Sequence, residues 1–177
     1  MRSQYRAEVM AHKKNRKVHI GPHATLYFED RLTMQYQIQE MLRAERIFEP
    51  RDSEAELDTY NPLIPDGTNL KATFMLEYDD AGERRAALAR LIGIEDKVWI
   101  KVGDHDRVWS IADEDMERDT AEKTSSVHFL RFELTPEMMG SAKQGAAIAA
   151  GIAHELYTYE NDPLPQAVRD SLVNDLD

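Results

Sequence analysis

The segment that decides the fold is FEDRLTMQYQIQEMLRAERIF, which occupies residues 28–48. Its larger apolar residues recur at spacings typical of one face of an amphipathic α-helix. We therefore predict a helix of about four turns from Arg31 to Ile47. Asp30 precedes this helix as a favourable N-cap, because its carboxylate can accept a hydrogen bond from an unpaired N–H group of the first turn. The apolar positions are Met34, Ile38, Met41, Leu42 and Phe48.

One charged residue, Glu45, falls inside this apolar stripe. It follows Met41 at one helical turn and Ile38 at two, so the pattern predicts that its side chain points towards the core. A buried carboxylate must be paired, hydrogen-bonded or protonated, because burying a bare charge is very costly. We therefore expect a polar site beside this helix.

The composition fits a single domain, residues 1–177, with a core of its own. The chain has no cysteine, which excludes disulfides, thiol nucleophiles and cysteine-held zinc or iron–sulfur sites within it. The sequence shows no apolar run of membrane-spanning length and no apolar leader segment. We expect a cytoplasmic protein that does not enter a membrane.

The net charge of −11 is distributed unevenly. Residues 1–17 hold six basic side chains and one acidic side chain, so the rest of the chain is strongly acidic. An acidic body argues against general nucleic-acid binding. The basic run at residues 12–17 has two interpretations. It could contact phosphates or an acidic partner, or it could be a solvated helix end, where cations suit the helix dipole.

Alternating apolar and polar residues predict strands, most clearly at 70–78 and 127–134. In the second of these the apolar side chains occupy the even positions, which places His128 on the core side. Shorter strands are expected at 24–28, 98–102 and 108–112.

The order of these elements predicts an α+β fold. We expect a curled, largely antiparallel sheet of about five or six strands, packed around a central amphipathic helix. A basic N-terminal helix within 1–17 and a C-terminal helix within 163–177 would complete the domain.

Histidines occur close to a second histidine or to acidic residues at three places, none of them with the spacing of a metal site. The Gly-Pro between His19 and His23 prevents a helix, so their spacing sets no ligand geometry. The run at 104–106 has the composition of a hairpin turn, and His154 lacks the second histidine of a zinc-protease motif. We assign no metal ligand and no cofactor. A phosphate-cradling loop and a nucleophile elbow are also absent, so we assign no catalytic residue.

The remaining polar residues around the predicted helix form a candidate pocket. Carboxylates and a histidine in a half-buried place can do acid–base work or hold a divalent metal. The alternative is a structural network, in which Glu45 is paired with an arginine or hydrogen-bonded by Tyr60 or Asn61. The candidates are Gln37, Glu40, Arg43 and Glu45 on the helix, with Glu77 and His128 on neighbouring strands.

Several stretches resemble a bacterial family catalogued as a domain of unknown function, DUF 3501. The run at 37–47 is the most specific of them. One departure is Ala153, where family members often have an aspartate before the histidine. The matching stretches are Gly21-Pro22, Leu26-x-Phe28-Glu29, Thr33, Gln37 to Ile47, Tyr60-Asn61-Pro62-Leu63-Ile64-Pro65, Ala72-Thr73 with Glu77, and Ser126 to Phe132.

The resemblance implies no established activity. Members of this family are often encoded beside rubrerythrin-like and iron–sulfur oxidoreductase proteins, which implies an accessory role in a redox or oxidative-stress system. The polar residues of the matching motifs are the site candidates that it implies. They add Tyr60, Asn61 and Arg131 to the candidate pocket.

Two functions follow as hypotheses. The first is an accessory or interaction protein that acts on an iron–sulfur or rubrerythrin-like redox partner, since any cysteine-held cluster must belong to that partner. The second is a small ligand- or metal-binding enzyme that uses the polar pocket around the helix. Whether the chain is an enzyme stays open, and so does a homodimer.

Overall fold

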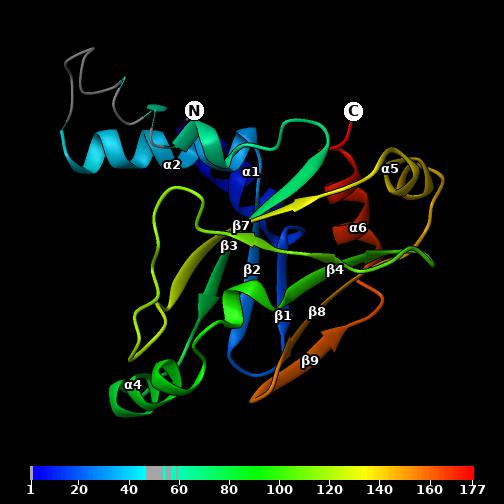
Figure 1. Ribbon diagram of the computed structural model, residues 1–177. Helices are drawn as coiled ribbons and strands as arrows, with labels where there is room; N and C mark the ends of the chain where they lie inside the picture. The colour runs from blue at the N-terminus through cyan, green and yellow to red at the C-terminus, as the bar shows by residue number, and fades with distance from the viewer. Residues whose placement is uncertain (1, 47–53, 55–56, 59) are drawn as a thin grey trace.

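The computed structural model describes residues 2–46, 54, 57–58 and 60–177 (Figure 1). The strands of these residues form two antiparallel sheets. One sheet has the strand order β1-β2-β3-β7-β6, and the other has the order β5-β4-β8-β9. The strands are β1 (Lys17–Ile20), β2 (Ala24–Glu29), β3 (Asn69–Leu76), β4 (Val98–Val102), β5 (Val108–Trp109), β6 (Ile111–Ala112), β7 (Val127–Glu133), β8 (Ile148–His154) and β9 (Tyr157–Asn161).

The helices in the described part of the chain lie at the ends and margins of the two sheets (Figure 1). α1 packs against α2, and α5 packs against α6 and β4. Two short 3₁₀ turns, η1 (Asn61–Leu63) and η2 (Ile94–Asp96), occur within connections. The α-helices are α1 (Arg2–Lys14), α2 (Arg31–Ala44), α4 (Ala81–Arg90), α5 (Pro136–Lys143) and α6 (Gln166–Val173).

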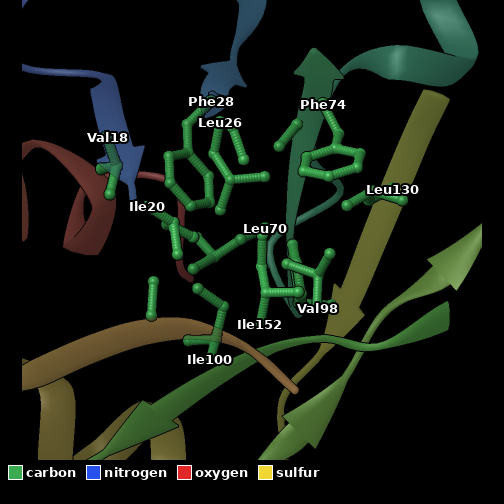
Figure 2. Close-up of a cluster of buried hydrophobic side chains, with 14 of the residues drawn as sticks. Val18, Ile20, Leu26, Phe28, Leu70, Phe74, Val98, Ile100, Leu130 and Ile152 are labelled. Carbon is green, nitrogen blue, oxygen red and sulfur yellow. The ribbon is translucent and has the colours of Figure 1, made fainter. Parts of the chain in front are cut away.

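The main core lies between the two sheets and joins side chains from both of them. In the first sheet Leu26 pairs with Phe74, and Phe74 pairs with His128, so these side chains share one face. Ile100 and Ile152 of the second sheet reach the same cluster, as Figure 2 shows. Because successive side chains of a strand alternate between faces, the position of His128 in this row places it in the core.

The start of α2 confirms the predicted N-cap. Asp30 accepts a hydrogen bond from the Thr33 N–H, and the Thr33 hydroxyl accepts one from the Asp30 N–H, which together form a capping box. The helix ends at Ala44 rather than at Ile47, which lies outside the described residues. Its buried side chains are Thr33, Met34 and Ile38, so none of them lies in the last six residues of the helix. The second half therefore reaches beyond the protein body, as Figure 1 shows.

This geometry overturns the prediction for Glu45. The residue is the C-cap of α2, and it is exposed. The spacing of the apolar residues is helical, as predicted, but periodicity does not tell where a helix leaves the surface of the domain. The basis for expecting a pocket around Glu45 is therefore removed.

The two sheets are joined by backbone on one side and by side chains on the other. β5 and β6 are separated by Ser110 alone, yet β5 pairs in one sheet and β6 in the other. On the opposite side the buried Tyr157 hydroxyl donates to the Ile20 carbonyl at 2.6 Å, and it accepts hydrogen bonds from two N–H groups that begin β2. Both connections fix how the sheets face each other.

The predicted fold class is confirmed at the level of helices combined with antiparallel sheets. The strand count is corrected, because the described residues form nine strands in two sheets instead of one sheet of five or six. The curled arrangement around a central helix is not confirmed, since the main packing of α2 is against α1 and β2. In the part of the chain that the structure describes, we find no helix with the length and apolar character needed to cross a membrane.

Candidate functional site

The centre of the candidate site is His128, whose imidazole is fully buried among polar side chains. The residue lies near the start of β7, where strand alternation turns it inwards beside Phe74, with the two ring centroids 6.1 Å apart. Both of its ring nitrogens have close partners, so the orientation of the imidazole is fixed from two sides. A histidine so restrained is suited to holding a ligand at a defined position.

Asp113 holds one side of this imidazole. Its Oδ2 atom lies 2.6 Å from His128 Nδ1, and its Oδ1 atom accepts hydrogen bonds of 2.9 Å from the Phe129 N–H and from Arg118. Asp113 has a φ of 51°, a left-handed conformation that aspartate tolerates better than most residues. This conformation follows directly after β6 and aims the carboxylate back at β7.

Three oxygen-bearing side chains lie on the Nε2 side. The Thr124 hydroxyl is 2.9 Å from His128 Nε2, and it can donate its one proton either to Glu95 Oε2, at 3.2 Å, or to Asp119 Oδ1. The two carboxylate oxygens lie 3.8 Å and 4.0 Å from Nε2. The Ser125 carbonyl, 2.9 Å from Nε2, completes the surroundings of that nitrogen.

The carboxylates of Glu95 and Asp119 reach this point from two separate connections. Glu95 lies in η2, which follows Gly93, a residue with a φ of 85° that glycine adopts readily. The Gly93 N–H donates to Asp119 Oδ2 at 3.1 Å, and the Glu95 carbonyl accepts a hydrogen bond from Ser110 at 2.5 Å. The backbone around η2 therefore positions both acids.

The surroundings shift the pKa values of these two acids in opposite directions. Burial raises the pKa of Glu95 to about 8, and a hydrogen bond to Asp119 adds to the effect. Burial acts in the same direction on Asp119, but hydrogen bonds from Glu95 and Thr124 outweigh it and hold the pKa of Asp119 below its usual range. At neutral pH the pair therefore holds one proton, which Glu95 carries and donates to the ionised Asp119.

A cleft of about 320 Å³ leads to these carboxylates from solvent. Its surroundings are strongly acidic, with Arg118 as a cationic lining residue. Such a mouth favours the approach of cations. Its lining consists of Glu95, Asp96, Ala112, Asp113, Glu117, Arg118 and Asp119.

The geometry fits a metal ion. One donor atom each from Glu95, Asp119 and His128 lies within 4.8 Å of the others. Two ligands that are each about 2.1 Å from one cation lie roughly 3.0–3.4 Å apart, so the separations of 3.8 Å and 4.0 Å from His128 Nε2 would each have to shorten by about half an ångström. The hydrogen bond from Nδ1 to Asp113 matches the carboxylate–histidine pairing that orients metal-binding imidazoles.

The structure places the expected pocket residues on separate elements. Gln37, Glu40 and Arg43 belong to α2, and Tyr60 and Asn61 belong to the cap and first residue of η1.

The other candidates lie on or next to the first sheet. Glu77 follows β3 and accepts a hydrogen bond from Tyr27, whereas Arg131 points to the opposite face of β7 from His128 and pairs with Glu114 and Glu133. Of the expected set, His128 is the member that the described structure places in this cluster.

Sequence reasoning missed Glu95, Asp113, Asp119 and Thr124. They come from a 3₁₀ turn and from the β6–β7 loop, where no hydrophobic period applies, and their separations along the chain match no metal-binding motif. The available signal was the prediction that His128 faces the core, because a buried histidine requires polar partners. The acidic composition of residues 113–119 was the natural place to look for them.

Comparison with known proteins gives a family but no activity. The family model described as "Protein of unknown function (DUF3501)" matches residues 1–176. No curated protein matches the chain. A crystal structure of a novel protein of unknown function from Burkholderia pseudomallei K96243 is 54% identical, with a TM-score of 0.93. The match covers 99% of this chain and 91% of that one, so the fold extends to this relative.

Proposed function

The chain belongs to the DUF3501 family of proteins of unknown function, and within that family we propose that it is a divalent-metal-binding protein whose centre is built by Glu95, Asp119 and His128. The observation that carries the proposal is the convergence of three donor atoms, two of them from Glu95 and Asp119, which line a cleft, and the third from the buried His128 behind them. Sites that keep positions open towards solvent are typical of metals that act on a ligand, whereas structural sites are closed by protein.

The donor set indicates the class of metal. An imidazole nitrogen combined with carboxylate oxygens suits Mn²⁺, Fe²⁺ or Zn²⁺, whereas Ca²⁺ and Mg²⁺ prefer oxygen donors throughout. The chain offers no thiolate, which removes the ligand that soft metals prefer. We therefore propose a transition metal in the divalent state.

Each residue would have a distinct part in such a centre. His128 would bind through Nε2 in place of its present hydrogen bond to the Ser125 carbonyl, with its orientation fixed by Asp113 at Nδ1. Glu95 would release the proton that it shares with Asp119, and both carboxylates would then offset the charge of the cation. The metal itself would supply Lewis acidity to a small molecule entering the cleft.

Thermal unfolding of the full chain tests the proposal. The protein is stripped with a chelator, and unfolding is then followed with Mn²⁺, Fe²⁺, Zn²⁺, Ca²⁺ or Mg²⁺ added. A metal at one hundred times its Kd stabilises the folded state by about 2.7 kcal/mol, which corresponds to a rise in Tm of roughly 5–11 °C for a chain of this size. We expect the rise with at least one transition metal and a much smaller one with Ca²⁺ or Mg²⁺.

Three variants locate the binding. His128→Gln and Asp119→Asn should lose the rise in Tm, whereas His19→Gln should keep it, because His19 is exposed on β1 and remote from the cluster along the sheet. If no metal raises the Tm of the wild type, or if all three variants respond alike, the buried cluster is a structural network and the proposal is wrong.

The accessory role remains a second proposal, based on the family resemblance and on the absence of cysteine. A cytoplasmic protein with an acidic body and a basic α1 could dock on an iron-containing redox partner through complementary charge. Native extract passed over the immobilised full chain should then yield an iron–sulfur or rubrerythrin-like protein. Recovery that is unchanged when the basic side chains of α1 are replaced would count against this mode of docking.

A further inference from the structure

A second cleft, on the outer face of the β5-β4-β8-β9 sheet, has a floor formed by Trp99. Four residues form one row across this sheet, because Trp109 pairs with Trp99, Trp99 with Gly151 and Gly151 with Glu160. Directly paired residues project from the same face. The row therefore places two tryptophan side chains, a glycine that has no side chain and a carboxylate next to one another.

Gly151 lets the Trp99 ring lie flat on the sheet. A Cβ atom at this position would be 2.3 Å from Cζ2 of the indole, which is closer than any side chain could approach. Trp99 is consequently only 3% exposed although it lies on the outer face. The indole is thus held in one orientation, with its free face, the one not packed on Gly151, turned away from the sheet.

A guanidinium group covers that free face. Arg107, an exposed residue of the β4–β5 turn, has its Cζ atom 4.2 Å from the centroid of the Trp99 ring. Planar guanidinium groups stack on indoles by a cation–π contact, for which tryptophan is the best of the aromatic residues. Arg107 shows by its own position that the floor accepts a guanidinium.

A carboxylate, that of Glu160, lies beside this floor. Among the described residues, the Glu160 side chain makes no hydrogen bond and no ion pair, although it lines the same cleft as Arg107. The cleft has a volume of about 320 Å³. An arginine arriving from outside could stack on Trp99 and pair with Glu160 at once, a combination that the tethered Arg107 does not make.

We propose that this cleft binds an arginine side chain presented by a partner protein, and that Arg107 occupies the position until the partner arrives. The net charge of −11 complements a basic partner surface. The apparent Kd of the partner is its intrinsic Kd divided by the fraction of molecules in which Arg107 has left the site. If that fraction is about one in ten, removing Arg107 should strengthen binding by about tenfold.

Fluorescence of Trp99 reports on this cleft directly. The chain has two tryptophans, so Trp109→Phe leaves Trp99 as the single one. Adding Arg107→Ala to this background uncovers the indole and should shift its emission to longer wavelength. Titration with the peptide acetyl-Gly-Arg-Gly-amide should then reverse the shift in a saturable way, with an apparent Kd about tenfold lower than when Arg107 is present.

Matched probes and variants decide the outcome. The citrulline peptide, neutral but of the same shape, should not bind, and the lysine peptide should bind several-fold more weakly than the arginine peptide. Adding Glu160→Gln should weaken arginine binding several-fold, and Arg107→Gln should act as Arg107→Ala does. Absence of saturable binding by the arginine peptide, equal binding of citrulline or lysine, or no effect of Glu160→Gln would each overturn the proposal.

Discussion

Asp113→Asn perturbs the proposed metal centre without removing a ligand. In the wild type, Oδ2 accepts from His128 Nδ1, and Oδ1 accepts from both the Phe129 N–H and Arg118. An asparagine offers one acceptor oxygen and one amino group. When Nε2 binds a metal, Nδ1 carries the proton, so either orientation of the amide places a donor against a donor and one set of these contacts is lost. In both orientations the negative charge that these donors face is lost as well.

The contacts that Asp113→Asn removes determine how much stability and metal affinity should be lost. A buried hydrogen bond to a charged group contributes about 1.5–3 kcal/mol, so the metal-free protein should lose about 2–3 kcal/mol of unfolding free energy. Removing the outer partner of a metal-binding histidine typically weakens metal affinity by about 10–100-fold. Both losses should therefore appear in one variant.

Two assays separate these losses. Urea unfolding in chelator measures stability, and isothermal titration measures metal affinity. Asp115→Asn is the matched control, because Asp115 also binds Arg118 but its side chain is 59% exposed, and a surface pair contributes about 0–1 kcal/mol. The reasoning is refuted if Asp113→Asn is indistinguishable from Asp115→Asn in both assays.

Three further substitutions test which buried polar groups stabilise the fold. Arg16→Met removes the partner of Asp175 in a buried ion pair of 2.5 Å and should cost about 3–5 kcal/mol in urea unfolding; a loss below about 1 kcal/mol would contradict this. Burial raises the pKa of Glu29 to about 7, so the folded state holds a proton that the unfolded state has released. Unfolding free energy should fall as the pH rises from about 4.5 to 7, by up to about 1.4 kcal/mol per unit, and Glu29→Gln should flatten this slope in urea midpoints; parallel slopes would exclude Glu29 as the cause. Tyr157→Phe leaves the Ile20 carbonyl and two N–H groups without their partner and should cost about 2–3 kcal/mol, and a calorimetric Tm equal to that of the wild type would refute it.

Elements with local determinants could be predicted from the sequence. The capping box that starts α2 is written in Asp30 and Thr33, and the start of α5 is written in Thr135 and Pro136. Alternation in β7 correctly turned His128 inwards. In each case the residues that decide the structure are neighbours in the chain.

Features that depend on distant segments could not be predicted in the same way. The pattern around Glu45 predicts a helix whether the residue is buried or exposed. Which of the two occurs depends on whether a sheet covers that turn of α2. The split into two sheets depends on a crossing at Ser110, which has no distinct local signal. The partners of His128 come from loops whose meeting point is set by both sheets.

The location of the candidate centre follows from that crossing. The Ser110 N–H donates to Val98 of the second sheet, while the strand that follows it pairs with β7 of the first. The Ser110 hydroxyl also holds the carbonyl of Glu95, so the residue at the crossing positions one proposed ligand directly. Asp113, at the end of the same crossing, positions the imidazole of His128. The separation between carboxylate and imidazole is therefore set by how the two sheets face each other, and a cation that draws them together would act on the junction that holds the sheets in place.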